Sequence, residues 1–215
     1  MRNCYAVERR TACHLLLVAC AAALGVALTA VLPAPAHADH VAPPPVPPNI
    51  QVPAGNKIVF QGHAVGTQNY ICLPSGAGAA WVFFGPQATL FKDNGSQLIT
   101  HFLSPNPDER GVPRATWQDS DDTSAIWAVA SASSSDPHFV APGAIPWLLL
   151  QVVGAEDGPS GGDTLSRIAF IQRLNTSGGV APTGCTLSTD VGSKALVPYR
   201  ADYFFYKATN AKAAP

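Results

Sequence analysis

A serine flanked by glycines is the first pattern in this chain that could carry catalysis. Residues 158–162 read Gly-Pro-Ser-Gly-Gly and fit G-x-S-x-G, in which a nucleophilic serine occupies a tight turn between a strand and a helix. In such enzymes an acidic residue and then a histidine follow the serine, but every histidine of this chain precedes Ser160. Pro159 among glycines also indicates a flexible loop. The order of the histidines and the proline in the loop therefore argue against an esterase.

The histidines could bind a metal under one condition. If a leader were cleaved after Ala36, His37 would become the amino terminus, and a terminal amine with an imidazole can chelate copper. His63, His101 or His138 could complete that site and make a copper-dependent oxidative enzyme. The proline-rich stretch after His37 argues against it, because a metal site needs fixed ligands. Without the terminal amine these histidines have no short ligand spacing, so we expect neither a metal nor another cofactor.

Three carboxylates lie close together in a predicted turn. Asp119, Asp121 and Asp122 could hold calcium, because clustered carboxylates suit a hard cation. No glycine follows them at the bend that such a loop requires. A solvated turn is the simpler interpretation.

Four other side chains suit the lining of a binding pocket. Gln68, Tyr70, His101 and Trp117 combine aromatic surface with a few polar groups, as ligand pockets in small barrels do. They are our candidate ligand-binding residues, and simple packing is the alternative for each. The expected partner is a small molecule or a component of the cell envelope.

Short apolar runs separated by turn residues must position these candidates. The predicted strands are 57–62, 67–73, 81–84, 88–92, 97–102, 115–118, 124–130, 145–153, 167–174 and 201–207. Asn94-Gly95 predicts a type I′ hairpin turn, in which both residues have positive φ. The nearest candidate for a helix, 164–174, has apolar spacing that fits a strand better. We therefore predict an all-β protein, a single antiparallel barrel or sandwich domain with Pro- and Gly-rich loops.

The amino-terminal residues have the order of a secretory signal. Arg2, Arg9 and Arg10 precede an apolar run over 15–32, and Ala-His-Ala at 36–38 fits a cleavage site. The alternative is a retained membrane anchor, because the run is nearly long enough to span a bilayer. The cleavage site favours removal, so we expect residues 1–38 to be a signal peptide and the mature protein to be secreted, without a membrane span.

The mature chain divides into an arm and a domain. Residues 39–49 contain five prolines, so they predict an extended arm that cannot join a central strand and most simply acts as a disordered tether. Residues 50–215 then form the all-β domain. Without the leader the chain has ten basic and thirteen acidic residues, spread without runs, which argues against binding nucleic acid. A monomer is expected.

Only two cysteines, Cys72 and Cys185, would remain after removal of the leader. Two cysteines far apart in an oxidising compartment most simply form one disulfide. Two buried free thiols or a metal site are the alternatives. The chain has no C-x-x-C pair, which argues against redox catalysis.

Several motifs together resemble a family of exported bacterial and fungal proteins of unknown function, DUF3455. They cover roughly residues 50–207 in one order: Gln68–Cys72, Ala88–Asp93 with Gly95, Ile145–Leu149, Ile171–Arg173 with Asn175-Thr176, Gly178–Cys185 and Tyr199–Tyr203. The resemblance implies an exported single domain without an established activity. It also implies that Cys72 and Cys185 occupy the two cysteine positions of the family.

The chain departs from the family pattern in the second predicted hairpin. Arg114-Ala115 stands before Thr116-Trp117 where the family has Gly-Pro, and Asp122-Thr123-Ser124 replaces an Asp-Gly-Ser turn. The geometry of this hairpin, and any function of its loop, therefore do not follow from the resemblance.

These observations favour a secreted binding or envelope-associated module of unknown biochemical function over an enzyme. The alternative is a small secreted enzyme, hydrolytic or metal-dependent. No complete set of catalytic residues supports that alternative.

Overall fold

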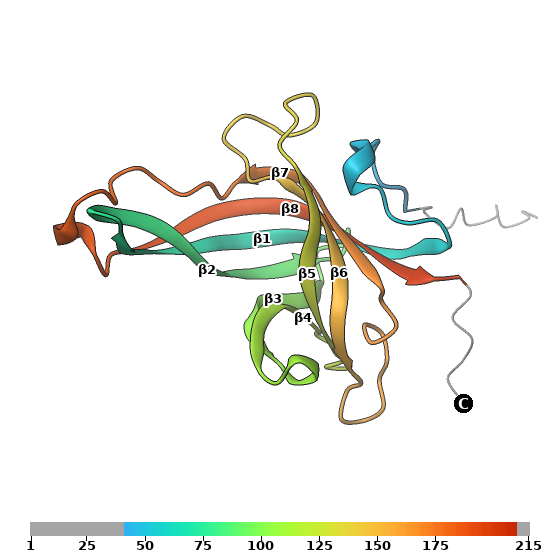
Figure 1. The fold of residues 1–215 in the computed structure, drawn as a ribbon. Coiled ribbons are helices and arrows are strands. Elements are labelled where there is room, and N and C mark those ends of the chain that lie inside the picture. Colours follow the sequence, from blue (N-terminus) through green and yellow to red (C-terminus); the bar gives the residue numbers. More distant parts are fainter. Residues whose placement is uncertain (1–40, 210–215) are drawn as a thin grey trace, which may run out of the picture. The chain divides into compact units, whose positions relative to one another are not determined.

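Eight antiparallel strands form a closed barrel in the computed structural model, which describes residues 41–209 (Figure 1). Each strand pairs with the next, and the last pairs back with the first, so the predicted all-β barrel is confirmed. The predicted signal peptide lies outside the described residues. The strands are β1 (Asn56–Ser75), β2 (Gly78–Phe91), β3 (Gln97–Asn106), β4 (Val112–Asp119), β5 (Ala125–Ser134), β6 (Trp147–Glu156), β7 (Phe170–Gly178) and β8 (Lys194–Ala208).

Two strands are longer than the sequence predicts. β1 contains both 57–62 and 67–73, and β2 contains both 81–84 and 88–92, so the breaks expected at 62–66 and 85–86 are wrong. The backbone stays extended at 62–66 because β8 pairs with it throughout. Pro86 pairs with Gln68 of β1, while β2 pairs with β3 only over 88–91. Proline is tolerated where a strand has a single neighbour.

The hairpin predicted around Asn94-Gly95 is confirmed, but its turn type is wrong. Only Gly95 has positive φ, 81°, whereas a type I′ turn needs it at Asn94 as well. The Gly95 N–H donates to the Lys92 carbonyl at 2.9 Å, and the Lys92 N–H donates to the Ser96 carbonyl at 2.9 Å. This is a three-residue loop with a glycine bulge. The Asn94 side chain stabilises it by accepting from the Ser96 N–H at 3.0 Å.

The lumen of the barrel holds the main hydrophobic core. Alternate residues of the strands point inward, as the buried Leu90, Ile126 and Ile171 illustrate. Tyr203 and Phe205 of β8 are completely or almost completely buried among them.

A second core covers the outer face of β6, β7 and β8. It contains Ile50, Val140, Trp147, Leu149, Leu174, Phe204 and Tyr206. Ile50 ends the short helix η1 (Pro48–Ile50), and its carbonyl accepts from Gln172 Nε2 at 2.7 Å. Val41 and Val46 of the proline-rich arm pack against the same cluster. For residues 41–49 the expectation of a free tether is therefore wrong, because apolar side chains among the prolines attach the arm to the barrel.

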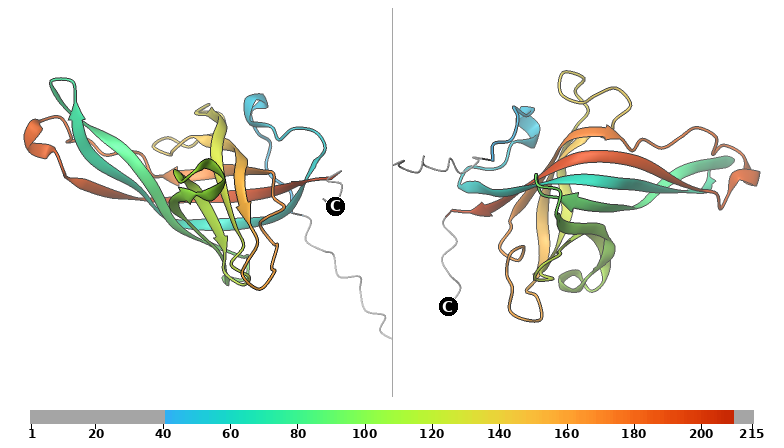
Figure 2. Two further views of the ribbon diagram at one scale, coloured as in Figure 1. Left: turned by 60° about the horizontal axis from the view of Figure 1, so that its bottom comes forward. Right: turned by 180° about the vertical axis from the view of Figure 1, so that it is seen from behind.

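The far end of the β1–β2 hairpin projects past the other strands, together with the segment before β8 (Figures 1 and 2). That segment contains the short helix η3 (Ser188–Asp190). A disulfide between Cys72 and Cys185 joins the two parts, which confirms the predicted pairing. Cys72 N–H also donates to the Ser193 carbonyl at 2.8 Å, and Ala79 N–H donates to the Thr186 carbonyl at 3.2 Å. The second half of the segment is thus held to the hairpin at Thr186 and at Ser193.

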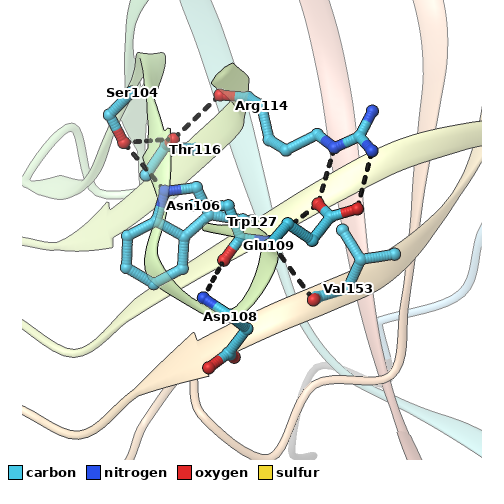
Figure 3. A network of polar contacts seen from close by, with 8 residues as sticks. All are labelled: Ser104, Asn106, Asp108, Glu109, Arg114, Thr116, Trp127 and Val153. Atoms are coloured by element: carbon cyan, nitrogen blue, oxygen red, sulfur yellow. Dashed lines mark hydrogen bonds and ion pairs between the residues drawn. The ribbon is translucent and has the colours of Figure 1, made fainter. Parts of the chain in front are cut away.

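A polar network fastens the turn between β3 and β4 to β6 (Figure 3). The turn carries the short helix η2 (Pro107–Glu109). Asn106 is completely buried, and its Nδ2 donates to Glu109 Oε2 at 2.8 Å and to the Val153 carbonyl at 3.2 Å. Arg114 donates two 2.7 Å hydrogen bonds to Glu109, which lower the pKa of Glu109 to about 2. A Cβ at Gly154 would lie 2.2 Å from Asn106 Oδ1, so this close approach requires glycine.

No helix between residues 41 and 209 has the length and apolar character needed to cross a membrane.

Candidate functional site

A cavity of about 190 Å³ opens into the barrel lumen, and all eight strands contribute to its lining. Most of the lining is apolar. Every second residue of a strand lines the cavity, as Ala115 and Trp117 do on β4, because successive side chains of a strand point to opposite faces. Phe83 and Leu103 are exposed and mark the mouth, whereas Ala128 is buried deeper. The cavity is therefore a funnel with an apolar entrance.

Aromatic and polar side chains form the buried end of this cavity. The ring of His101 stacks on Trp117 with centroids 4.1 Å apart, and Tyr203 packs edge-on against both rings. His101 Nδ1 lies 2.8 Å from the Thr116 carbonyl, so this nitrogen carries the proton and donates it. Burial lowers the pKa of His101 to about 3, and the charge of Arg173 contributes to the decrease. His101 is therefore neutral near neutral pH.

Arg173 of β7 is the only lining residue with a full charge. Its exposed fraction is 9%, and one terminal nitrogen donates to the Pro146 carbonyl at 2.8 Å. Within residues 41–209, no ion pair includes Arg173. Burial raises the pKa of Tyr203, and the positive charge of Arg173 opposes that increase. A buried cation without a counter-charge is energetically unfavourable.

Buried hydrogen-bond donors without acceptors concentrate in this cavity. In the part of the chain that the structure describes, five buried side-chain nitrogens lack a hydrogen-bond partner, and three of them belong to cavity residues. These are Gln68 Nε2, Trp117 Nε1 and Arg173 Nε. Buried polar groups are normally satisfied, so three unpaired donors in one cavity indicate a place for an acceptor.

Three of the four predicted ligand-binding residues line the cavity, namely Gln68, His101 and Trp117. Tyr70 does not. The bulge opposite Asn69 and Tyr70 lies in β2, where Phe84 has no partner in β1, whereas β1 keeps a regular register with β8 at these residues. The Tyr70 hydroxyl donates to the Gly179 carbonyl at 2.7 Å. Its ring packs edge-on against Phe83 at 5.7 Å between centroids. Tyr70 therefore supports a residue of the mouth from outside the cavity.

The catalytic and metal-binding patterns of the sequence remain apart in space. Residues 158–162 lie in the loop between the strands β6 and β7, and no helix follows Ser160 before β7. Between residues 41 and 209, no group of three or more His, Cys, Asp or Glu side chains is placed to hold a metal ion. The copper hypothesis also needs His37, which lies outside the described residues.

The carboxylates of the acidic turn are engaged by the backbone. Asp119 Oδ1 accepts from the N–H groups of Asp121 and Asp122 at 2.8 and 2.9 Å. The two oxygens of Asp122 accept from Ser124 N–H at 2.8 Å and from Thr164 N–H at 3.0 Å. These contacts favour the interpretation as a structural turn.

A family model described as a protein of unknown function (DUF3455) matches residues 53–207. The chain belongs to the DUF3455 family. The match includes both disulfide cysteines and nearly all of the barrel, which confirms the resemblance found in the sequence. No curated protein and no solved structure matches the chain. In this DUF3455 protein the cavity is therefore the feature that bears on function.

The second predicted hairpin forms with Thr123 in its turn. β4 pairs with β5 in regular register, and Thr123 has a φ of 62°. This is the left-handed region that glycine favours. The chain therefore has a threonine in a backbone conformation that glycine adopts more easily.

Sequence reasoning missed Arg173 and Phe83 of the DUF3455 cavity. A signal for Arg173 was available, because it lies two residues after the inward-facing Ile171 and so shares its face of β7. A charged residue in phase with core positions is a reason to expect a buried partner or ligand. Phe83 gave no comparable signal, because its neighbours Val82 and Phe84 are equally apolar.

Proposed function

We propose that this DUF3455 protein is an exported binding module that holds a small, mostly apolar molecule in its barrel lumen. The observation that carries the proposal is the cavity itself, in which apolar walls surround three buried donors without partners. Small-molecule pockets combine predominantly apolar linings with a few convergent polar groups.

The size of the cavity limits the ligand. An apolar cavity of about 150 Å³ inside another protein binds benzene. The cavity of about 190 Å³ therefore fits one aromatic ring or a short aliphatic chain that carries a polar group.

Export and contact with the cell envelope are parts of the same proposal. The order of residues 1–38 supports export, and so does the disulfide, because disulfides persist in oxidising compartments. Val82, Phe83 and Phe84 expose apolar surface on β2 at and beside the mouth. Such a surface suits a ligand that arrives from an apolar source such as the envelope.

Calorimetric titration and thermal unfolding with two neutral probes, benzyl alcohol and benzamide, test the proposal. We expect saturable binding at one site. We also expect an increase of about 2.7 kcal/mol in the free energy of unfolding at a probe concentration of about one hundred times Kd, since the probe binds only the folded state.

Two leucine variants separate the lumen from the surface. Ala128→Leu fills the buried cavity, so it should weaken probe binding by about tenfold or more. Ala141→Leu adds the same side chain in an exposed loop and should leave binding unchanged. Equal binding by wild type and Ala128→Leu would show that the probes do not occupy the lumen, and the proposal would then be wrong.

A further inference from the structure

We infer that the ligand of the lumen is a small monocarboxylate, with its carboxylate beside Arg173 and its aromatic or short aliphatic body toward Phe83 and Leu103. This inference rests on the proposed function and adds the chemical class and the orientation of the ligand.

The charge of Arg173 calls for an anion. The side chain is 9% exposed and forms no ion pair with any residue in 41–209. One terminal nitrogen donates to the Pro146 carbonyl, and Nε has no partner among the described residues. A carboxylate supplies the missing negative charge and accepts from the guanidinium in the geometry that arginine favours. A neutral ligand would leave the buried charge uncompensated.

The two other buried cavity atoms without a partner are donors as well. Gln68 Nε2 and Trp117 Nε1 both carry hydrogens and lack acceptors among the described residues. An ionised carboxylate only accepts, and its two oxygens offer about four lone-pair positions, enough for three donors. An ammonium ligand would bring further hydrogens and a second positive charge.

The charges of the cavity lining favour a ligand with one negative charge rather than two. Apart from Arg173 the lining is uncharged, because burial keeps His101 in its neutral form. A monoanion therefore balances the cavity, whereas a phosphate monoester would leave excess negative charge in a buried site.

The arrangement of the lining gives the orientation. Polar groups lie at the buried end, and Phe83, at 48% exposure, lies with Leu103 at the mouth. The carboxylate therefore enters first, and the apolar body fills the outer part of the funnel.

Matched pairs of probes test the inference by calorimetric titration. Benzoate is compared with benzamide, and hexanoate with hexanamide, so that each pair differs in charge and not in size. We expect wild type to bind at least one carboxylate about tenfold or more tightly than its amide. The two pairs also show whether the body is aromatic or aliphatic.

Variants locate the carboxylate. Arg173→Met should abolish the preference for carboxylate over amide, whereas Arg200→Met, at an exposed position of β8, should retain it. Without ligand, Arg173→Met should be at least as stable as wild type, because it removes an unpaired buried charge. Trp117→Phe keeps an aromatic ring but loses the N–H donor, so it should weaken carboxylate binding about threefold to tenfold.

The outcomes separate this inference from the proposed function. Equal affinity of wild type for carboxylates and amides would overturn the inference and leave the binding module standing. Failure of wild type to bind any probe would overturn both. Retention of the carboxylate preference by Arg173→Met would also overturn the inference. If that variant does not fold, the wild-type pairs and Trp117→Phe still decide the question.

Discussion

At Thr123 the backbone has a φ of 62°, where a β-branched residue is strained. Thr123→Gly should therefore raise the free energy of unfolding by about 0.5 to 1 kcal/mol, because the relief of left-handed strain exceeds the extra entropy that glycine gains in the unfolded chain. Chemical denaturation measures the change. Thr123→Ala retains a Cβ, so its gain in the free energy of unfolding should be smaller. A glycine variant less stable than wild type would show that the threonine is not strained.

His63 couples stability to pH. Its Nδ1 lies 2.6 Å from Asp202 Oδ1 and its Nε2 lies 2.7 Å from Asp93 Oδ1. Only the protonated ring can donate to both carboxylates. The hydrogen bond to Asp93 is the main cause that raises the pKa of His63, burial opposes it, and Asp202 raises it further.

The sign of this coupling follows from the raised pKa. The stabilisation is complete below the unfolded-state pKa of about 6.5 and disappears as pH rises through the folded-state pKa. Because the His63 side chain is 41% exposed, the effect should be below about 1 kcal/mol. Chemical denaturation at about pH 5.5 and about pH 9 measures the effect. Wild type should have a larger free energy of unfolding than His63→Gln only at the lower pH. A constant difference between the two proteins would contradict this prediction.

The types of individual residues predicted three of the thirteen residues that line the cavity. Gln68, His101 and Trp117 were identified as pocket residues from aromatic and polar character, and they do line one cavity. Tyr70 shares the face of β1 with Gln68, but it lies two residues further along the strand and outside the lining. The residue types do not show where along a strand a cavity ends. Arg173 was missed although it lies two residues after Ile171, because apolar residues occupy both faces of the predicted strand 167–174 and obscure which face points inward.

Among the elements, the turn between β3 and β4 depends on a single buried amide. Asn106→Ala would leave the Val153 carbonyl and the Asp108 N–H without the partners that the Asn106 side chain now provides. We expect a loss of about 2 to 3 kcal/mol in the free energy of unfolding, measured by chemical denaturation.

A matched control is available at an exposed asparagine. Asn49 donates one side-chain hydrogen bond, 2.7 Å, to the Ser133 carbonyl. Asn49→Ala should therefore cost less than about 1 kcal/mol. Equal losses for the two variants would show that burial of Asn106 adds nothing to its contribution.

The apolar periodicity predicted where the chain is extended, but not where the strands end. All ten predicted segments overlap strands, yet four of them merge into β1 and β2. Glycine and proline were interpreted as breaks at 62–66 and 85–86, where pairing with neighbouring strands keeps the chain extended. β8 begins at Lys194 rather than 201 because it pairs with β1, and pairing between strands so distant in the chain is not visible in local sequence.

Across the whole molecule, the disulfide connects parts of the chain that the barrel alone would not hold together. Cys72 and Cys185 are 113 residues apart, and one of them lies in the irregular segment before β8. Closing a loop of this length destabilises the unfolded chain by about 4 to 5 kcal/mol in the chain-entropy model.

The double variant Cys72→Ala/Cys185→Ala should therefore have a free energy of unfolding lower by up to about 4 kcal/mol, measured by denaturation without reductant. Wild type with reductant should approach the double variant, whereas the variant should not respond to reductant. An unchanged denaturation midpoint in the variant would show that the hydrogen bonds from Cys72 and Ala79 hold this segment without the covalent link.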